Sequence, residues 1–140
     1  MIILDTNVLS VLMKRGTEFT VDNWLDRQNA ELLWTTTITV FEIRFGIDLL
    51  ASGRQKQQLE IAFARCLKDD LQERILDFDR DAAREAATMA ARRQLAGRPV
   101  EFRDMEIAGI AAARRAPLAT RNTRHFENLG IELVDPWLIA

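Results

Sequence analysis

The first residue of chemical interest is Asp5, which directly follows the apolar run Ile2–Leu4. The apolar pattern resumes at Val8 and Leu9, so this carboxylate interrupts a segment that otherwise looks buried. One explanation is structural, because Asp is a preferred N-cap residue and could begin a helix at Thr6. The other is that the carboxylate lies at the end of a buried strand in order to bind a ligand or an ion.

Glu42 is a second acidic residue in an unexpected position. A helical wheel for Val40–Ala51 has one clear polar stripe, formed by Arg44 and Asp48. Glu42 falls outside this stripe, on an otherwise apolar face. Thr39 and Glu42 also match the capping-box pattern, in which a glutamate at the third helical position accepts the N–H of the cap residue. A capping role and a role in an acidic site both stay open.

Asp104 begins the helical pattern of "RDMEIAGIAAARR", a position that the helix dipole alone favours for an acid. Singly, each of these acids has a structural explanation. Together, Asp5, Glu42 and Asp104 predict carboxylates that converge on one pocket, where they repel one another unless a cation neutralises them. Oxygen ligands without clustered Cys or His favour Mg²⁺ or Mn²⁺ over Zn²⁺, and such an ion is suited to attack on phosphate esters.

The apolar pattern predicts short strands that alternate with helices. We expect strands at Ile2–Leu4, Leu32–Thr35, Arg74–Phe78, Pro117–Thr120 and Ile131–Val134. We expect helices at Thr6–Lys14, Val21–Gln28, Val40–Ala51, Gln55–Leu71, Arg80–Leu95 and Asp104–Arg115. This alternation favours an α/β fold with a parallel sheet flanked by helices, in which ligands bind at the carboxyl ends of the strands. Asp5 and Asn122 each follow a strand and are expected at that edge.

Length and composition are those of an ordinary globular protein. The 140 residues fit a single domain, residues 1–140, and 48% are hydrophobic and 29% charged. The formal net charge of −2 neither indicates nor excludes a nucleic-acid partner. The N-terminus lacks the features of a signal peptide, no apolar run approaches the ~20 residues of a bilayer-spanning helix, and the single cysteine, Cys66, excludes an internal disulfide. We therefore expect a cytoplasmic protein without membrane association.

Four segments of the sequence together resemble a known family. The segments "LDTNVLS", "TITVFEIRFGI", "RDMEIAGIAA" and "LATRNTRHFENLGIELVDPW" occur in the order and approximate spacing of a PIN domain and span nearly the whole chain. More narrowly, the chain resembles the VapC/FitB-type toxins of bacterial type II toxin–antitoxin pairs. The resemblance implies a three-layer sandwich and an Mg²⁺- or Mn²⁺-dependent endoribonuclease that acts on RNA. It also implies a VapB-like antitoxin as partner, a homodimer, and a higher hetero-oligomer with the antitoxin.

The family's acidic quartet falls on Asp5, Glu42, Asp104 and Asn122. Asp5 and Asp104 would be the principal metal ligands. Glu42 would bind the metal through water or act as general base for the attacking water. Asn122 stands where the family often has Asp, so this chain loses one negative charge and a second metal site would be weaker. Thr6 and Thr120, beside the acids, could orient ligands or waters.

Two other functions remain open. A phosphatase that uses a strand-end Asp as nucleophile usually needs a second acid two positions later, where this chain has Asn7. A PIN-like module could instead bind RNA or a partner without cutting, although such a pocket has no use for clustered negative charge.

Two groups of side chains are candidates for contacts outside the acidic site. Arg114, Arg115, Arg121 and Arg124 could converge beside the metal edge to bind RNA phosphates, or could serve only the helix dipole and solubility. The single histidine, His125, is expected as a solvated surface residue.

Phe41, Phe45 and Leu49 form a second apolar arc on the Val40–Ala51 helix. One apolar face is enough to pack such a helix on a sheet, so this arc is surplus to a monomer. Either the Gln55–Leu71 helix covers it, or it forms a groove that receives an antitoxin helix.

Overall fold

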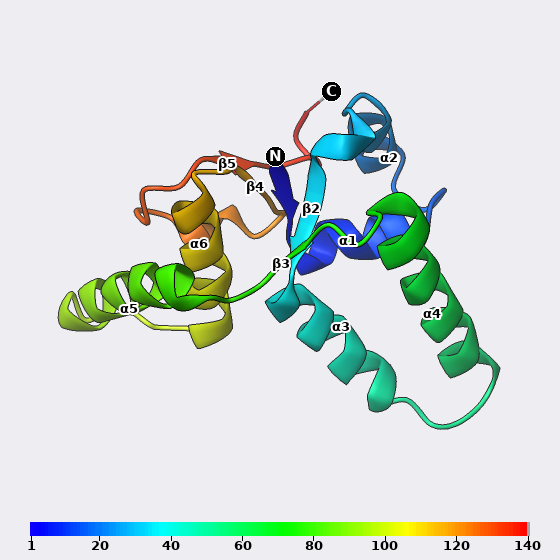
Figure 1. The fold of residues 1–140 in the computed structure, drawn as a ribbon, viewed down its shortest axis with the longest axis horizontal. Coiled ribbons are helices and arrows are strands. Elements are labelled where there is room, and N and C mark those ends of the chain that lie inside the picture. Colours follow the sequence, from blue (N-terminus) through cyan, green and yellow to red (C-terminus); the bar gives the residue numbers. More distant parts are fainter. Residues whose placement is uncertain (140) are drawn as a thin grey trace.

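A single parallel sheet lies at the centre of the computed structural model, which describes residues 1–139 (Figure 1). Its strand order is β3-β2-β1-β4-β5. The strands are β1 Ile2–Leu4, β2 Leu33–Thr36, β3 Ile75–Leu76, β4 Leu118–Ala119 and β5 Leu133–Val134. In the centre of the sheet, Ile3 pairs with Trp34 of β2 and with Leu118 of β4. The predicted parallel α/β sheet is confirmed.

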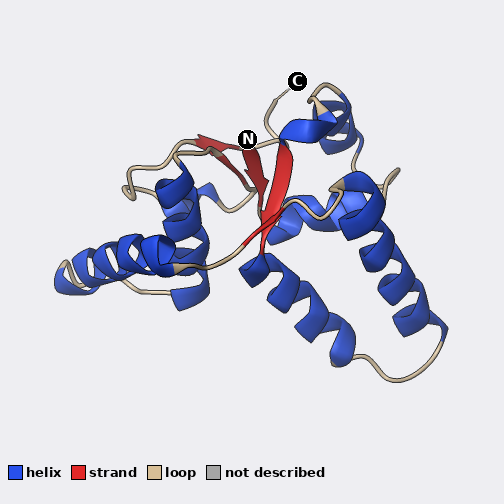
Figure 2. Ribbon diagram, viewed as in Figure 1, coloured by secondary structure: helices blue, strands red, loops and turns tan. Residues whose placement is uncertain are grey.

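Helices cover both faces of this sheet, as Figure 2 shows. Their bounds are α1 Thr6–Met13, α2 Phe19–Asp26, α3 Thr37–Asp48, α4 Arg54–Arg65, α5 Arg80–Leu95 and α6 Phe102–Arg114. Ile3 packs into the apolar cluster of α5 and α6, whereas Leu4 packs into the cluster of α1 to α4. Successive residues of a strand point to opposite faces, so the apolar run of β1 supplies both cores. The result is the three-layer sandwich that the sequence predicted.

The crossing of α5 and α6 depends on Gly109. A Cβ at this position would lie 2.5 Å from the carbonyl oxygen of Ala82 and 2.8 Å from the Cβ of Ala86. Glycine therefore lets the two helices approach closely. Because α6 carries Asp104 in its first turn, this packing also fixes where that carboxylate lies.

Several element boundaries differ from those predicted. Helix α3 begins at Thr37 rather than Val40, because the Thr36 side chain accepts the Thr39 N–H at 3.1 Å and caps the helix earlier. The predicted helix Gln55–Leu71 is two elements, α4 and a π-helical turn at Cys66–Asp70. The strands β3, β4 and β5 are each only two residues long.

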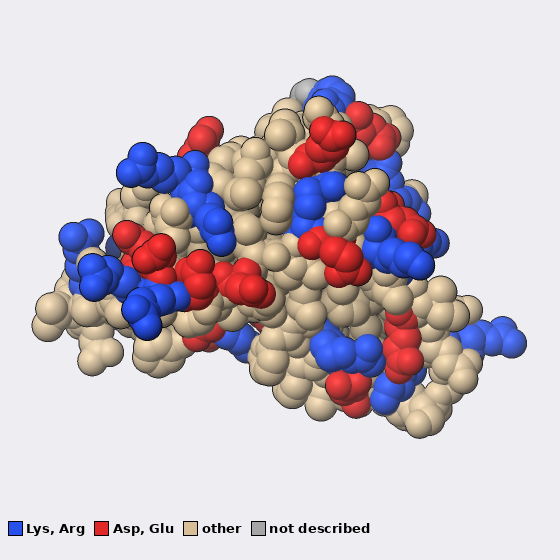
Figure 3. Space-filling view, viewed as in Figure 1, with Lys and Arg blue, Asp and Glu red and all other residues tan. Residues whose placement is uncertain are grey.

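The surface carries charges of both signs. On the face shown in Figure 3, Lys and Arg side chains are interspersed with Asp and Glu. Within residues 1–139, no helix is long and apolar enough to cross a membrane.

Candidate functional site

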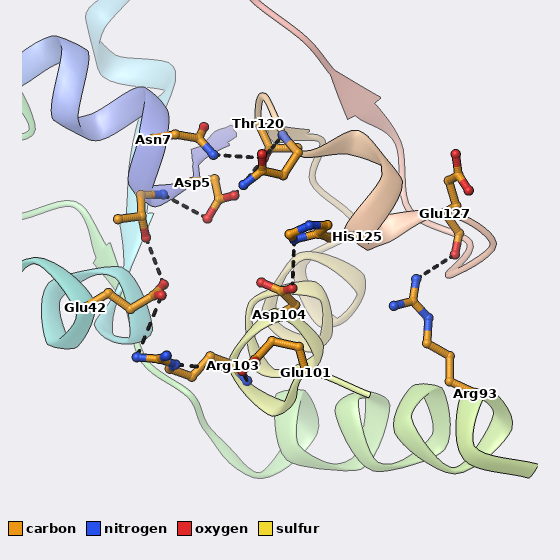
Figure 4. Close-up of polar contacts among 12 residues, drawn as sticks. Asp5, Asn7, Glu42, Arg93, Glu101, Arg103, Asp104, Thr120, His125 and Glu127 are labelled. Carbon is orange, nitrogen blue, oxygen red and sulfur yellow. Dashed lines mark hydrogen bonds and ion pairs between the residues drawn. The ribbon is translucent and has the colours of Figure 1, made fainter. Parts of the chain in front are cut away.

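Asp5 lies at the carboxyl edge of the sheet, where β1 ends and α1 begins. It is only 5% exposed. Its Oδ2 accepts a hydrogen bond from the Thr120 hydroxyl at 2.7 Å, and its Oδ1 accepts the Thr6 N–H at 2.8 Å (Figure 4). Burial raises the pKa of Asp5, and these two hydrogen bonds oppose part of the rise. The carboxylate is thus held in one orientation by the ends of two neighbouring strands.

Glu42 reaches the same edge from α3. Its Oε1 accepts a hydrogen bond from the Thr6 hydroxyl at 2.9 Å. Since Thr36 is the N-cap of α3, Glu42 lies beyond the third helical position, and the capping-box interpretation with Thr39 is wrong. Burial raises the pKa of Glu42, the Thr6 hydrogen bond lowers it, and the charge of Asp5 raises it further.

Asp104 reaches the edge from the first turn of α6. The cap of this helix is Glu101, whose side chain accepts the Arg103 N–H, so Asp104 is not needed as the cap. Its Oδ2 lies 3.2 Å from Nδ1 of His125. Burial raises the pKa of Asp104 to about 6; His125 opposes the rise, while the charges of Asp5 and of nearby glutamates add to it.

Asp5, Glu42 and Asp104, named here the acidic cluster, face one opening (Figure 4). Their charges act on one another, since Asp5 raises the pKa of both other acids. As the side chains stand, no three His, Cys, Asp or Glu groups within residues 1–139 are close enough to hold one ion together. The cluster is therefore an open acidic edge, and its donors are all oxygen atoms.

Comparison with known proteins identifies the family. Residues 2–132 match the family model of the PIN domain. The chain belongs to the PIN domain family. The plasmid stability protein StbB of Pseudomonas syringae pv. tomato is 38% identical over 98% of this chain and 99% of its own length. The VapC ribonuclease Y4jK of Sinorhizobium fredii is 36% identical, over 98% of each chain.

Solved structures show the same fold. The structure of FitAB bound to an IR36 DNA fragment superposes with a TM-score of 0.89, at 31% identity, over 100% of this chain and 98% of the other. A member of the VapBC family of toxin–antitoxin systems from Mycobacterium tuberculosis superposes with a TM-score of 0.69, at 26% identity, over 94% and 95%. This PIN domain therefore resembles the VapC/FitB-type toxins along its whole length.

Asn122 touches the site of this PIN domain through its backbone. Its N–H donates to the Thr120 hydroxyl at 3.0 Å, and the same hydroxyl donates to Asp5. The side chain of Asn122 is exposed, and within residues 1–139 it makes no hydrogen bond. The backbone of Asn122 thus supports Asp5 indirectly, through the Thr120 hydroxyl.

Two residues of the site were missed by the sequence analysis. His125 was expected to be merely solvated, yet it pairs with Asp104. Arg103 extends an Nη1 to within 4.0 Å of Glu42 and lies over the Phe41 ring. One feature of the sequence could have indicated Arg103. It is a positively charged residue in the first turn of a helix, a position that the helix dipole disfavours for a cation.

The four predicted RNA-binding arginines do not converge. Arg114 and Arg115 end α6, about 15 Å along the helix from its first turn, and Arg114 pairs with Asp79 at 3.5 Å. Arg121 lies over the Trp137 ring, 5.0 Å from its centre. Only Arg124 lines a cavity together with Asp104. The prediction of one basic group beside the acids is wrong.

The apolar arc of α3 is exposed. Phe41, Phe45 and Leu49, named here the apolar α3 surface, are 55%, 50% and 70% exposed. The two phenyl rings stack with centroids 6.0 Å apart. Helix α4 does not cover them, so the alternative that these rings belong to the monomer's core is wrong.

Proposed function

We propose that this PIN domain is the toxin of a toxin–antitoxin pair and a divalent-metal-dependent endoribonuclease. The observation that carries the proposal is the acidic cluster at the strand ends. Three carboxylates with raised pKa values face one opening, an arrangement that is costly in the free protein and favourable around a cation. The similarity to a VapC ribonuclease supports RNA as the substrate class.

The residues of the cluster fit a hard cation. All their donor atoms are carboxylate oxygens, the ligands that Mg²⁺ and Mn²⁺ prefer. Asp5 and Asp104 would hold the ion, and Glu42 would contact it through water. When bound, the ion would supply charge neutralisation at the phosphate and a lowered pKa for an attacking water.

The chain's own residues prepare this reaction by orientation and proton transfer. Thr120 and the Thr6 N–H fix the Asp5 carboxylate, so its oxygens point in a defined direction. Glu42 is held at Oε1 by the Thr6 hydroxyl, and its Oε2, which lies 4.0 Å from Nη1 of Arg103, would accept a proton from the attacking water. His125, from the turn after β4, contacts Asp104 and helps to position its carboxylate.

The substitution at position 122 affects the number of ions. An Asp at this position would add a fourth negative charge at the edge where Thr120 holds Asp5. With Asn122, we propose one well-held ion and a weaker second site, because an amide oxygen binds a hard cation less strongly than a carboxylate.

The apolar α3 surface is the proposed antitoxin site. Its three exposed side chains lie on the helix that carries Glu42, so a partner bound there would lie beside the acidic cluster. Arg103 already reaches Glu42, so a cationic side chain fits beside this acid. An antitoxin cation there would compete with the metal and inhibit cleavage. A homodimer contact would use a separate surface.

The phosphatase alternative is not supported by the structure. Asn7 stands where a second acid would be needed, and both ends of its amide are engaged. Its Nδ2 donates to the Thr120 hydroxyl at 3.5 Å, and its Oδ1 accepts the Arg121 N–H at 3.1 Å. Asn7 therefore braces the strand ends rather than serving as an acid.

Cleavage of RNA by the purified chain tests the proposal. We expect cleavage with Mg²⁺ or Mn²⁺, none with EDTA, and loss of cleavage in Asp5→Asn, with Glu85→Gln on α5 as an exposed acidic control. Full activity of Asp5→Asn, or of wild type in EDTA, would overturn the mechanism. Intact RNA under all conditions would favour a PIN-like module that binds without cutting.

A further inference from the structure

A cavity of about 430 Å³ opens beside the acidic cluster. It lies between the last turn of α5, the first turn of α6 and the turn Thr123–Phe126. Asp104 and His125 line its wall next to the cluster, so the cavity continues directly from the candidate active site. The rest of its charged wall includes Arg93, Arg98 and Arg124, and we name it the basic cavity.

The three arginines of the basic cavity have no acidic partner. Within residues 1–139, no carboxylate lies within ion-pair distance of any of them. The two acids that line the cavity are engaged elsewhere. Asp104 pairs with His125 at 3.2 Å, and Glu101 lies 3.8 Å from the Nε of Arg103. Three guanidinium groups thus line the cavity against two carboxylates, and neither carboxylate pairs directly with any of the three.

Arg93 shows that this arrangement is costly in the free protein. Its Nη2 donates to the backbone oxygen of Glu127 at 3.0 Å, which fixes the side chain. Its Nε is buried without a hydrogen-bond partner. Burial lowers the pKa of Arg93, and the charge of Arg98 lowers it further, while the charges of Asp104 and Glu127 oppose part of this decrease. Neighbouring guanidinium groups that repel one another are stabilised by an anion between them.

We propose that the basic cavity binds a backbone phosphodiester of the RNA strand, one that flanks the bond cleaved at the acidic cluster. The proposal rests on the proposed function in taking RNA as the ligand. Guanidinium groups match phosphate oxygens in geometry, and phosphate contacts set the position and register of a strand. The cavity volume of about 430 Å³ is larger than an isolated phosphate needs. A nucleotide unit within a chain therefore fits better than a free phosphate ion.

RNA binding in the absence of metal tests this subsite separately from cleavage. The probe is a short fluorescently labelled single-stranded RNA, and its anisotropy is measured in EDTA over a range of salt concentrations. The variant is Arg98→Gln with Arg124→Gln, both at exposed positions. The matched control, Arg80→Gln with Arg84→Gln, removes the same charge from exposed positions at the other end of α5. Thermal melting confirms that both proteins fold.

The cavity variant is expected to bind the RNA at least tenfold more weakly than the control variant does. Its plot of log K against log salt should be less steep by about 0.7 for each phosphate that the variant no longer neutralises. RNAs with one neutral methylphosphonate linkage, placed at each position in turn, should lose affinity for wild type at one linkage. The same linkage should have no effect on the cavity variant.

Equal RNA affinity of the cavity variant and the control would overturn the proposal. A cavity variant that binds RNA normally but loses affinity for inorganic phosphate would also overturn it, because the cavity would then bind a free anion rather than RNA. Wild type that binds RNA in this way yet never cleaves it would refute the nuclease activity and leave the subsite intact.

Discussion

Replacing Asp104 by Asn should stabilise the metal-free protein at neutral pH. The ionised Asp104 is disfavoured in the native state, first by burial and then by the charges of Asp5 and nearby glutamates. Asparagine keeps the shape of the side chain and places an oxygen or amide group where the carboxylate lies 3.2 Å from His125. The substitution therefore removes the unfavourable charge with little change in packing.

The magnitude follows from the pKa. Native Asp104 has a pKa of about 6 against a usual value of 3.8, a difference of about two units. At 1.36 kcal/mol per unit the ionised form costs about 3 kcal/mol, and solvent screening of this partly accessible carboxylate reduces that to about 1–2 kcal/mol. Because the native pKa is the higher one, the native state binds more protons between about pH 4 and 6. Wild-type stability therefore falls as the pH rises through this range and stays low above it.

Thermal unfolding at a series of pH values measures this effect. At pH 7.5 in EDTA, Asp104→Asn should melt about 3–8 °C above wild type, and the gain should shrink towards zero near pH 4. Saturating Mg²⁺ should raise the melting temperature of wild type more than that of the variant, because only wild type retains both proposed ligands.

The matched control is Glu85→Gln on the exposed face of α5, which should leave the pH profile unchanged. The reasoning would be refuted by an Asp104→Asn protein that is no more stable than wild type at pH 7.5. A gain of the same size at pH 4 and pH 7.5 would refute it equally, because charge repulsion would not be the cause.

Three further predictions concern the other site residues. Glu42→Gln keeps an acceptor for Thr6 but removes the charge, so RNA cleavage should fall about 10²–10⁴-fold with little change in melting temperature. A normal cleavage rate would show that Glu42 has only a structural role. Asn122→Asp should bind Mn²⁺ more tightly in calorimetric titrations, and unchanged affinity and stoichiometry would show that position 122 does not face the ion. Phe41→Ser with Phe45→Ser should lose binding of the antitoxin while the melting temperature stays near that of wild type, since both rings are exposed; unfolding without a selective binding defect would contradict it.

The sequence was sufficient to place the acids that follow directly from an element boundary. Asp5 follows an apolar run that forms a buried strand, and Asp104 lies in the first turn of a strongly periodic helix, two residues after the helix begins. The start of α3 could not be predicted, because Thr35, Thr36 and Thr37 suit a strand end and a helix cap equally well. The competing capping role of Glu42 depended entirely on that boundary.

Contacts between elements that are distant in the sequence could not be predicted from it. The pairing of His125 with Asp104 requires the turn after β4 to face the start of α6, which no local pattern states. The error over Arg114 has a simple cause. A strand carries the chain from the amino end of the sheet to its carboxyl end. Residues just before β4 therefore lie at the opposite end of the sheet from residues just after it. Nearness in sequence was mistaken for nearness in space.

Binding of Mn²⁺ to the isolated chain tests most directly whether the acidic cluster is a cation site. Electron paramagnetic resonance of free Mn²⁺ during a titration gives the stoichiometry without any RNA. We predict one well-held ion per chain in wild type and in Glu85→Gln, and loss of that site in Asp5→Asn and in Asp104→Asn. Wild type that binds no Mn²⁺, or variants that bind it as wild type does, would contradict the central claim.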